Sequence, residues 1–456
     1  MAFIPITIDD LRIGLYIKLE CSWWNHPFAK SKFKITSQKE IKTLKGIRKV
    51  KLFYDPDLSD PEEEPEIEAA QDVSAGAATA PTQEDLEREQ EALRKEQVQA
   101  CEEHTAELQK ASYLYQQVLA QTKIAMKRIS DGHAAGVKSA DQVVSSLIHS
   151  LNKSSTSMAM IDILTSAETD EPFLAHALNV CIVSLLVGRE YHLDDQELYA
   201  LGLAALLHDL GKQNFPAIMR MKRSGLTKSE QQEWLRHPAS GKAAVERLPA
   251  IPQATALAIY QHHERMDGSG FPLGLKGDEI SFFAKILMAA DEYDHLCHQP
   301  DPAKSLTPAE ALSHLYDHYI VDKLMAVGDA INDILNQKNA PNAAESETER
   351  AGSAIDQVDD KAELSEEVIV YMVRALGVYP PGSLVELTDG SVGLVTGVNS
   401  DERTKPCVMI CSPTVPRKEA RVIDLSTNDL AIVHSIRPQH VPKEIQQYIS
   451  SGRADF

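Results

Sequence analysis

Histidines and aspartates recur at a nearly regular interval through the middle of the chain, and this series constrains the fold more than any other feature. Its members are His176, the adjacent pair His208 and Asp209, His237, the adjacent pair His262 and His263, and Asp291. The successive gaps are 32, 28, 25 and 28 residues, about the length of one helix and one connection. If each helix of a bundle turns one such position inward, five helices converge on a single site.

The sequence around each member of the series supports a helix. "FLAHALNVCIVSLLV" and "DQELYALGLAALLHDLGK" are apolar on nearly every face, as in buried helices, and we expect the second helix to end near Gly211. In "KSEQQEWLRHPASGKAAVERL" we expect one helix to stop at Pro238 and another to start soon after it. Residues 135–338 are therefore predicted to form a helical bundle.

The residue types in the series are those of a metal centre. Neutral imidazoles with carboxylates suit iron, manganese or zinc, and no thiolate belongs to the set. A carboxylate has two oxygens and can bridge two metals at the ~3.5–4 Å separation used in two-metal phosphoryl chemistry. Asp209 follows His208 directly, so the two side chains diverge by ~100° around a helix. This divergence allows Asp209 to bridge two metals while His208 binds one of them. His262 and His263 diverge likewise, so both reach the site only if the end of their helix points at it.

The segments before the bundle differ in composition. Residues 1–60 contain short β-type runs and one expected short helix at 37–47, which predicts a small α/β or mainly β module. Residues 61–83 are acidic and then rich in Ala, Pro, Ser and Thr, as in a disordered linker. Residues 84–134 are rich in charged residues, Gln, Ala and Leu, which predicts a long charged helix and leaves a homodimer through residues 84–129 open.

After the bundle, a second low-complexity linker is expected at residues 339–364. In the C-terminal residues 365–456, "GSLVELTDGSVGLVTGV" has two alternating runs around Asp389 and Gly390, which predicts a β-hairpin. Further short runs predict more strands and hence a small β-barrel-like module. The expected fold class is multidomain and mainly α, with a central helical bundle between two small β-containing modules.

Composition limits the partners and the compartment. The formal net charge of −21 argues against binding to a nucleic acid duplex. The stretch from Lys30 to Lys51 runs against this trend, with eight lysines and one arginine against one acid, and fits either a solvated rim or a docking surface for an acidic partner. Six scattered cysteines fit a reducing compartment. No apolar run reaches ~20 residues, so we expect a cytoplasmic protein without membrane insertion.

Two motifs in the series resemble those of a known family. "HDLGK" at residues 208–212 is similar to the metal motif of the HD phosphohydrolase superfamily. "HHERMDGSGFP" at residues 262–272 resembles the HHExxDGxGYP signature of its HD-GYP group, and the resemblance covers roughly residues 140–335. The N-terminal "SWWNHPFAKSKFKI" also resembles a small domain often fused ahead of such cores, and "YPPGSLVELTDG" is similar to C-terminal extensions of the same proteins.

The resemblance implies an activity, because HD-GYP members hydrolyse the bacterial second messenger cyclic di-GMP. It implies a bacterial, cytoplasmic cyclic di-GMP phosphodiesterase with two divalent metal ions, iron or manganese with zinc as the alternative, and no organic cofactor. In that scheme a metal-bridging hydroxide attacks phosphorus and the 3′ oxygen departs, which gives linear pGpG and leaves GMP open as a further product.

Carried over residue by residue, the resemblance also assigns roles within the site. It implies that Asp209 is the bridging carboxylate and that Lys212 lies close to the substrate phosphate, so both are candidate catalytic residues. Substrate contacts are expected from Lys212, Gly268, Gly270, Phe271 and Lys304. The implied metal ligands are His176, His208, Asp209, His237, His262, His263 and Asp291.

The chain departs from the family pattern at three positions. Some members hold a third metal with a glutamate four residues before the first histidine, but that position is Pro172 here, which favours two metals. The family tyrosine is replaced by Phe271, which lacks a hydroxyl that could bond the substrate. Gln299 and Pro300 stand where many members have Arg-Pro, which leaves Lys304 as the nearby cation.

Two alternatives to the enzyme remain open. The altered tyrosine and arginine positions favour a catalytically weak or inactive cyclic di-GMP-binding effector that docks protein partners through its N- and C-terminal modules. A phosphohydrolase of another nucleotide is the other alternative. The complete ligand set favours the enzyme, because nothing in a pure scaffold requires seven metal ligands.

Overall fold

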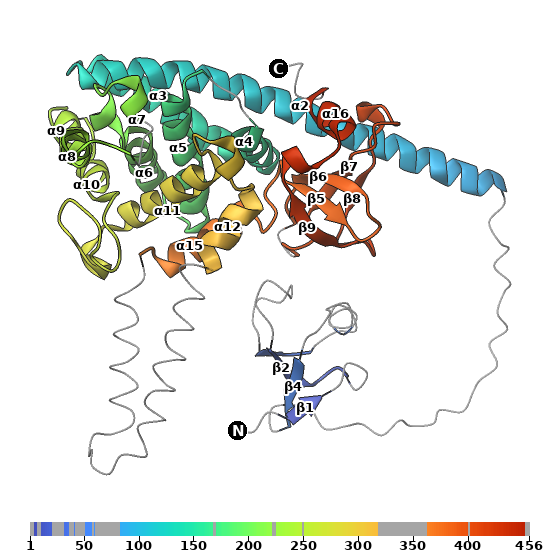
Figure 1. The fold of residues 1–456 in the computed structure, drawn as a ribbon. Coiled ribbons are helices and arrows are strands. Elements are labelled where there is room, and N and C mark those ends of the chain that lie inside the picture. The colour runs from blue at the N-terminus through green and yellow to red at the C-terminus, as the bar shows by residue number, and fades with distance from the viewer. Residues whose placement is uncertain are drawn as a thin grey trace, which may run out of the picture. The chain divides into compact units, whose positions relative to one another are not determined.

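A computed structural model of the protein divides the chain into two compact units (Figure 1), Met1–Ala92 with Glu402–Thr404 and Leu93–Asp401 with Lys405–Phe456. The two predicted linkers, at 61–83 and 339–364, lie almost entirely outside the described residues. The structure describes residues 4–6, 11–20, 32–35, 41, 51–56, 59, 83–166, 170–220, 225–248, 250–317, 363–399 and 402–451.

The first unit contains a four-stranded antiparallel sheet in the order β1-β4-β2-β3. Its strands are β1 (Ile4–Ile6), β2 (Tyr16–Glu20), β3 (Lys32–Lys34) and β4 (Lys51–Asp55). Ile17 and Leu52 lie in its small apolar core. The expected short helix at 37–47 and most of the lysine-rich stretch fall outside the described residues, apart from Ile41 and the strand residues.

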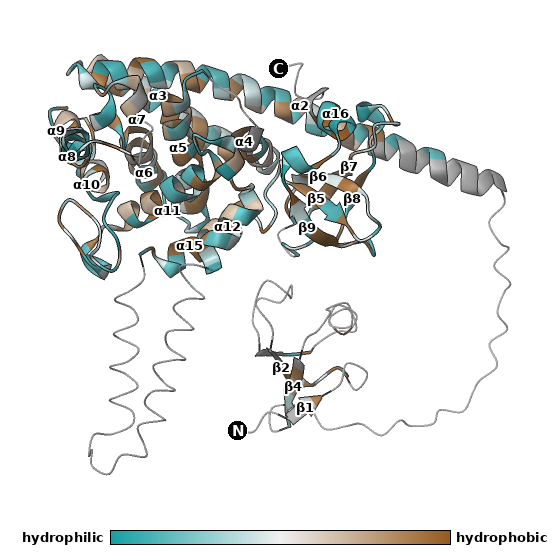
Figure 2. Cartoon of the chain, in the orientation of Figure 1, coloured by the Kyte–Doolittle hydropathy of each residue, from teal (hydrophilic) through white to brown (hydrophobic). Residues whose placement is uncertain are grey.

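A single 48-residue helix, α2 (Gln83–Ser130), occupies the segment where the sequence predicts a long charged helix. Hydrophilic and hydrophobic residues alternate along it in Figure 2, as expected for a helix with one exposed face. Its buried stripe includes Leu108, Tyr115, Val118 and Met126, which recur at three- to eight-residue spacings.

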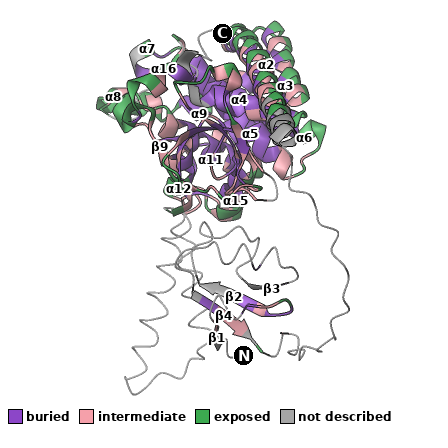
Figure 3. Cartoon of the chain, turned by 90° about the vertical axis from the view of Figure 1, so that its right-hand side faces the viewer, coloured by how far each residue is buried: buried purple, intermediate pink, exposed green. Residues whose placement is uncertain are grey.

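The second unit contains a helical bundle built around α5 (Pro172–Glu190), in which every residue from Phe173 to Gly188 is buried. In Figure 3 the buried residues of α5 lie at the centre of the bundle, beside the more exposed α2 and α3. Helices α6, α11 and α15 pack directly against α5. The other bundle helices are α3 (Ala135–Leu151), α4 (Ser154–Ser166), α6 (Asp195–Leu207), α7 (Ala217–Arg220), α8 (Lys228–Trp234), α9 (His237–Glu246), α10 (Gln253–Gln261), α11 (Phe282–Cys297), α12 (Pro308–Tyr316) and α15 (Glu366–Leu376), with short 3-10 turns η3 (Leu210–Lys212), η4 (Gly277–Glu279) and η5 (Pro302–Lys304).

Among the described residues, α5 is also the one helix whose length and composition would suffice to cross a membrane. Within its most apolar 18-residue window, 89% of the residues are buried inside the bundle. Packing against neighbouring helices therefore accounts for its apolar composition.

Two predicted helix ends are wrong by a few residues. Helix α6 ends at Leu207 rather than near Gly211, and the chain turns there into η3. A Cβ atom on Gly211 would lie 2.0 Å from the carbonyl oxygen of His237, so the glycine permits η3 to touch the start of α9. Pro238 does not stop a helix but lies in the first turn of α9, where a proline costs no hydrogen bond.

The segment predicted to begin the C-terminal module at residue 365 belongs partly to the bundle. Residues 366–376 form α15, which packs on α5, α11 and α12 through an apolar stripe that includes Ile369 and Met372. A strongly one-sided helix needs such a surface, and the bundle provides it. The first strand of the C-terminal sheet begins only at Leu384.

The C-terminal strands form a five-stranded antiparallel sheet in the order β8-β7-β6-β5-β9, and the predicted hairpin around Asp389 and Gly390 joins β5 to β6. One face of the sheet packs on α2 and α16 through a core that includes Cys101, Met409 and Tyr448. The elements are β5 (Leu384–Leu387), β6 (Val392–Gly397), β7 (Cys407–Ile410), β8 (Val422–Asp424), β9 (Ile432–Ile436), α16 (Lys443–Ser451) and the short turns η8 (Arg417–Glu419) and η9 (Pro438–His440). The mainly helical class with a small C-terminal sheet is thereby confirmed.

Candidate metal centre

The helical bundle brings the whole histidine and aspartate series together. Two members project from within helices, His176 from α5 and Asp291 from α11. The other five lie at helix ends rather than on helix faces: His208 and Asp209 follow α6, His237 begins α9, and His262 and His263 follow α10. All seven side chains are at most 7% exposed.

Backbone carbonyls hold three of the histidines in one orientation. The Nδ1 atoms of His208, His237 and His262 lie 2.7, 2.6 and 2.7 Å from the carbonyl oxygen of the residue three positions earlier. Those carbonyls end a helix and have no partner within it, so each imidazole donates to one of them. A proton fixed on Nδ1 leaves the Nε2 lone pair free to face the site.

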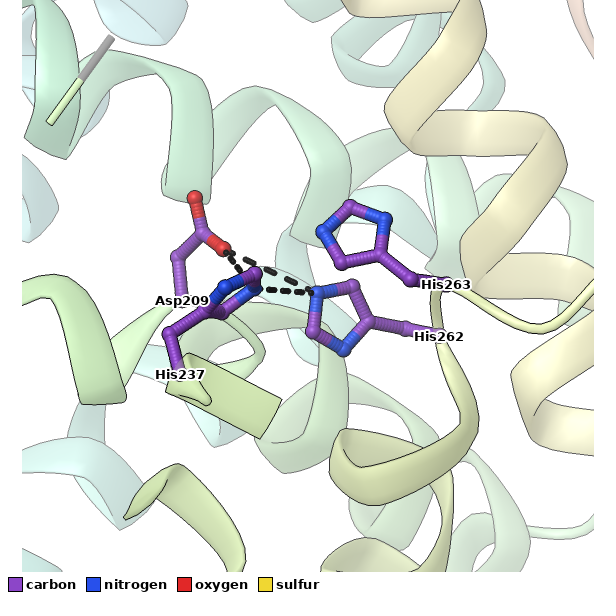
Figure 4. Close-up of side chains that lie close together, drawn as sticks. All are labelled: Asp209, His237, His262 and His263. Carbon is purple, nitrogen blue, oxygen red and sulfur yellow. Dashed lines mark hydrogen bonds and ion pairs between the residues drawn. The ribbon is translucent and has the colours of Figure 1, made fainter. Parts of the chain in front are cut away.

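Asp209 stands between two groups of histidines, and each of its oxygens faces one group. Oδ1 lies 3.3 Å from Nε2 of His237 and 3.7 Å from Nε2 of His262. Figure 4 shows these side chains, with His263, converging from different segments. Oδ2 lies 3.6 Å from Nε2 of His208 and 3.9 Å from Nε2 of His176. Two sets of closely spaced ligand atoms, one with three histidines and one with two, therefore share a single carboxylate.

His176 is held between two further carboxylates on α11. Its Nε2 lies 3.2 Å from Oδ1 of Asp291, and its Nδ1 lies 2.7 Å from Oδ2 of Asp294. Burial alone would lower the pKa of His176, but the hydrogen bonds to Asp291 and Asp294 raise it to about 10. The excess of carboxylates at this end of the site favours a positive charge between them.

The other charges of the site match what metal ligands require. Burial lowers the pKa of His208 to about 4 and that of His237 to about 3, so both imidazoles are neutral at pH 7. Burial would raise the pKa of Asp209, but Lys212 and His208 hold it well below its usual range. Neutral imidazoles and an ionised carboxylate are the forms that bind divalent cations.

The arrangement leaves several buried polar atoms without partners, and these atoms fit a metal. Nε2 of His208, Oδ1 of Asp209 and Nε2 of His263 are buried with no hydrogen-bond partner among the described residues. Nε2 of His237 faces Nε2 of His262 at 3.2 Å. Because both rings carry their proton on Nδ1, two lone pairs meet there and repel unless a cation attracts both. The donor set is therefore one that divalent metal ions satisfy.

An aromatic wall and a glycine-rich loop border the histidine cluster. The ring of Phe271 stacks on His263 with centroids 4.8 Å apart, and the indole of Trp234 lies 5.1 Å from the ring centroids of both His237 and His263. Both carboxylate oxygens of the fully buried Glu264 accept hydrogen bonds from backbone N–H groups of the loop, at Leu273 and Leu275.

Two glycines have distinct roles in this loop. Gly268 has a φ of +81°, a conformation that favours glycine. A Cβ on Gly270 would lie 2.3–2.4 Å from backbone atoms of Arg265 and Glu264, so only glycine lets the loop pass so close to the two residues that follow the histidine pair. The predicted turn beside the ligands is therefore built by close backbone approach.

The structure separates the two predicted substrate cations. The ammonium group of Lys212 lies 2.8 Å from Oδ2 of Asp209 and 5.0 Å from the ring centroid of Trp234. Lys304 is on η5 with its side chain 75% exposed, 3.8 Å from Asp301, and no hydrogen bond or ion pair links it to the cluster within the described ranges. Gln299 donates its side-chain amide to the carbonyl of His295 and so folds back on α11.

Sequence reasoning missed two residues that contact the cluster, Asp294 and Trp234, and a third, Asn179, that contacts Asp294. Asp294 lies three positions after the predicted ligand Asp291 on α11, and Asn179 lies three positions after His176 on α5. Residues at this spacing lie on the same face of a helix. Trp234 lies three positions before His237. A search for polar or aromatic neighbours at i±3 from each ligand would have found all three.

Comparison with known proteins agrees with this geometry. The sequence model of the HD domain family matches residues 158–319, and that of a domain of unknown function (DUF3391) matches residues 4–140. Residues 158–319, which hold the histidine and aspartate cluster, are thus similar to the HD domain family. The 262–272 motif resembles, more narrowly, the signature of the HD-GYP group.

Three curated relatives carry the comparison further. The chain is 26% identical over 400 residues to the cyclic di-GMP phosphodiesterase PA4108 of Pseudomonas aeruginosa, covering 86% of this chain and 80% of that protein. It is 36% identical over 135 residues to the cyclic di-GMP phosphodiesterase response regulator RpfG of Xanthomonas campestris, covering 29% and 36% of the two chains. It is 32% identical over 130 residues to the 3'3'-cGAMP-specific phosphodiesterase 3 of Vibrio cholerae, covering 28% of each.

Proposed function

We propose that this protein is a metal-dependent phosphodiesterase that hydrolyses cyclic di-GMP to linear pGpG, with the seven-residue cluster as its dinuclear metal site. The observation that carries the proposal is the position of Asp209. Its two oxygens face separate groups of histidines, as a carboxylate that bridges two ions must. The names of the relatives supply the substrate class.

The proposed ligands divide between two ions. His237, His262 and His263 group with Asp209, whose Oδ1 faces the first two, while His176 and His208 lie on the side of Oδ2 and Asp291 lies beside His176. Nitrogen and oxygen donors without thiolates favour iron or manganese, with zinc as the alternative. Glu171, the acid nearest the position of a third-metal ligand, pairs instead with Lys123 on α2 and is 44% exposed, which supports two ions rather than three.

Divalent ions at these positions supply two effects, polarisation of the phosphoryl oxygens and a lower pKa of bound water. The chain's own residues bind and orient the substrate. Lys212, held beside Asp209 and against Trp234, offers a positive charge to the phosphate in a buried environment where its effect is large. Phe271 presents an aromatic face at the edge of the cluster, suited to stacking against a base or ribose.

The compartment and the partners are further parts of the proposal. The five cysteines among the described residues are all free thiols, which supports a reducing, cytoplasmic environment. The N-terminal module and the C-terminal sheet, proposed to be barrel-like, are candidate surfaces for protein partners, and α2 is a candidate surface for a homodimer.

The test is product analysis with protein loaded anaerobically with Mn(II) or Fe(II). We expect conversion of cyclic di-GMP to linear pGpG. Binding of cyclic di-GMP without a linear product would refute the enzyme and favour the effector. Faster turnover of 3′3′-cGAMP than of cyclic di-GMP would support a metal-dependent phosphodiesterase but refute cyclic di-GMP as its preferred substrate. The name of one relative suggests this outcome.

A further inference from the structure

A continuous line of buried hydrogen bonds leads from α2 into the histidine cluster. The hydroxyl of Tyr115 on α2 donates to Oδ1 of Asn179 at 2.9 Å. Nδ2 of Asn179 donates to Oδ1 of Asp294 at 2.8 Å. Oδ2 of Asp294 in turn accepts from Nδ1 of His176 at 2.7 Å. The four side chains are between 1% and 7% exposed, so water does not compete for these bonds.

Each bond in this line has only one workable direction. Nitrogen atoms of His176 and His298 lie 2.7 and 2.8 Å from the two oxygens of Asp294, so this carboxylate is surrounded by donors and accepts on both sides. The amide nitrogen of Asn179 must therefore face Asp294, which turns its oxygen toward α2. That oxygen needs a donor, and the hydroxyl of Tyr115 is that donor. Reversing any one bond would bring two acceptors together in a buried site.

Tyr115 does not belong to the part of the chain that forms the HD domain. It lies before residues 158–319 and within the 4–140 match to the domain of unknown function. The same helix carries Cys101, whose thiol lies 3.0 Å from the carbonyl oxygen of Arg417 and whose side chain is in the core of the C-terminal sheet. Fourteen residues separate Cys101 from Tyr115, about 21 Å along one helix.

We propose that Tyr115 is a positioning residue of the metal centre, which orients the imidazole of His176 through Asn179 and Asp294. The inference rests on the proposed function, because it takes His176 as a metal ligand. A carboxylate behind a ligating histidine fixes the ring and raises its basicity, and removing such a partner typically costs 10–100-fold in metal affinity or activity. Tyr115 acts one bond further away, by fixing Asn179 and thereby Asp294.

Helix α2 therefore contacts both the C-terminal sheet, through Cys101, and the residue that holds Asp294 behind His176, which is Asn179. A shift of α2 along or around its axis would move the hydroxyl of Tyr115 from Asn179 before it disturbed any ligand directly. Metal affinity and turnover therefore depend on a helix outside the catalytic domain.

The full-length Tyr115→Phe variant tests this role, since it removes only the hydroxyl. We expect the helical content to be unchanged, the Mn(II) affinity to fall about 2–10-fold, the equivalent of one ordinary hydrogen bond, and kcat to fall with KM unchanged. Asp294→Asn should lower the Mn(II) affinity about 10–100-fold. Tyr113→Phe is the matched control, because Tyr113 lies on the same helix with 68% of its side chain exposed.

A double-mutant cycle separates positioning from a general loss of packing. If Tyr115 acts through Asp294, adding Tyr115→Phe to Asp294→Asn causes no further loss of Mn(II) affinity. Wild-type Mn(II) affinity in Tyr115→Phe, or the same loss in both backgrounds, would overturn the proposal. Failure of the proposed function would give a different result, in which the wild type binds Mn(II) but leaves cyclic di-GMP intact. The Mn(II) affinities of the wild type and the variants would still test the positioning role of Tyr115.

Discussion

The ammonium group of Lys212 lies 2.8 Å from the carboxylate oxygen Oδ2 of Asp209, one turn of 3-10 helix along the chain. Both side chains are buried, at 5% and 2% exposure. The "HDLGK" motif therefore places a cation against the carboxylate proposed to bridge two metals. Under the proposed function, the same cation stabilises the negative charge of a bound phosphate.

Replacing this lysine separates metal binding from catalysis. We expect Lys212→Met to retain its metal, because Asp209 and the histidines remain, and to lose about 10²–10³-fold in kcat, as for other buried charge-stabilising donors. Metal analysis and steady-state kinetics check both parts. Lys242→Met, on the partly exposed side of α9, serves as the control. Loss of metal in Lys212→Met would contradict the role assigned to this lysine.

Gly211 tests the contact between η3 and α9. A methyl group at this position would meet the carbonyl oxygen of His237 at 2.0 Å, and backbone atoms cannot yield as a flexible side chain does. We expect Gly211→Ala to lower the free energy of unfolding by about 1–3 kcal/mol and to weaken metal binding. Chemical denaturation and metal titration measure these effects.

Gly397→Ala is the matched control for this substitution, because the nearest atom to its added methyl lies at 3.8 Å. Equal stability of the two variants would show that η3 and α9 do not approach as closely as described.

Phe271→Tyr restores the hydroxyl that the family signature carries. Phe271 borders the cluster and stacks on His263, and a para hydroxyl lies in the plane of its ring rather than within the stack. We expect KM for cyclic di-GMP to fall about 2–10-fold, the worth of one hydrogen bond, with kcat nearly unchanged. Phe282→Tyr, at an exposed position on α11, should leave KM as it is. A KM that does not move in Phe271→Tyr would exclude the ring edge from substrate contact.

The ion pair between Arg437 and Glu310 joins the C-terminal sheet to α12, with the guanidinium Nε 3.1 and 3.0 Å from the two carboxylate oxygens. Burial would raise the pKa of Glu310, but hydrogen bonds from Thr307 and Arg437 hold it below its ordinary 4.5. An acid with a lowered folded-state pKa stabilises the fold at neutral pH, and this stabilisation is lost as the pH falls through that pKa.

We therefore expect Arg437→Gln to lower the free energy of unfolding at pH 7 by about 1 kcal/mol or less, since the pair is partly exposed. The difference from the wild type should shrink as the pH falls from 4.5 through the lowered pKa of Glu310, because the carboxylate becomes protonated over that range. Denaturation at pH 7 and pH 3.5 measures both values, with Lys418→Gln as a control. A difference that persists at low pH would assign the effect to packing rather than to the ion pair.

The sequence predicts the membership of the site but not the way it is built. Spacing identifies the seven residues because a helix and its connection have a typical length, so periodic ligands imply converging helices. Spacing cannot show that five of them lie at helix ends, because the choice between helix and turn at His208 depends on the close contact of Gly211 with His237.

Long-range partners are beyond sequence patterns for a similar reason. Tyr115 is 64 residues from Asn179, and nothing in the local composition of α2 distinguishes it from Tyr113, which is exposed. The packing of α15 on α5 likewise joins helices that are far apart in the sequence. Only the tertiary arrangement decides which apolar stripe meets which helix.

The most direct test of the central claim is metal content and turnover of Asp209→Asn beside the wild type, both loaded with Mn(II). The account predicts about two ions per wild-type chain with formation of linear pGpG. It predicts at most one ion and no measurable product for Asp209→Asn, because an amide offers one neutral oxygen where two charged ones face the histidines. Two ions and wild-type turnover in Asp209→Asn would contradict a bridging role for this carboxylate.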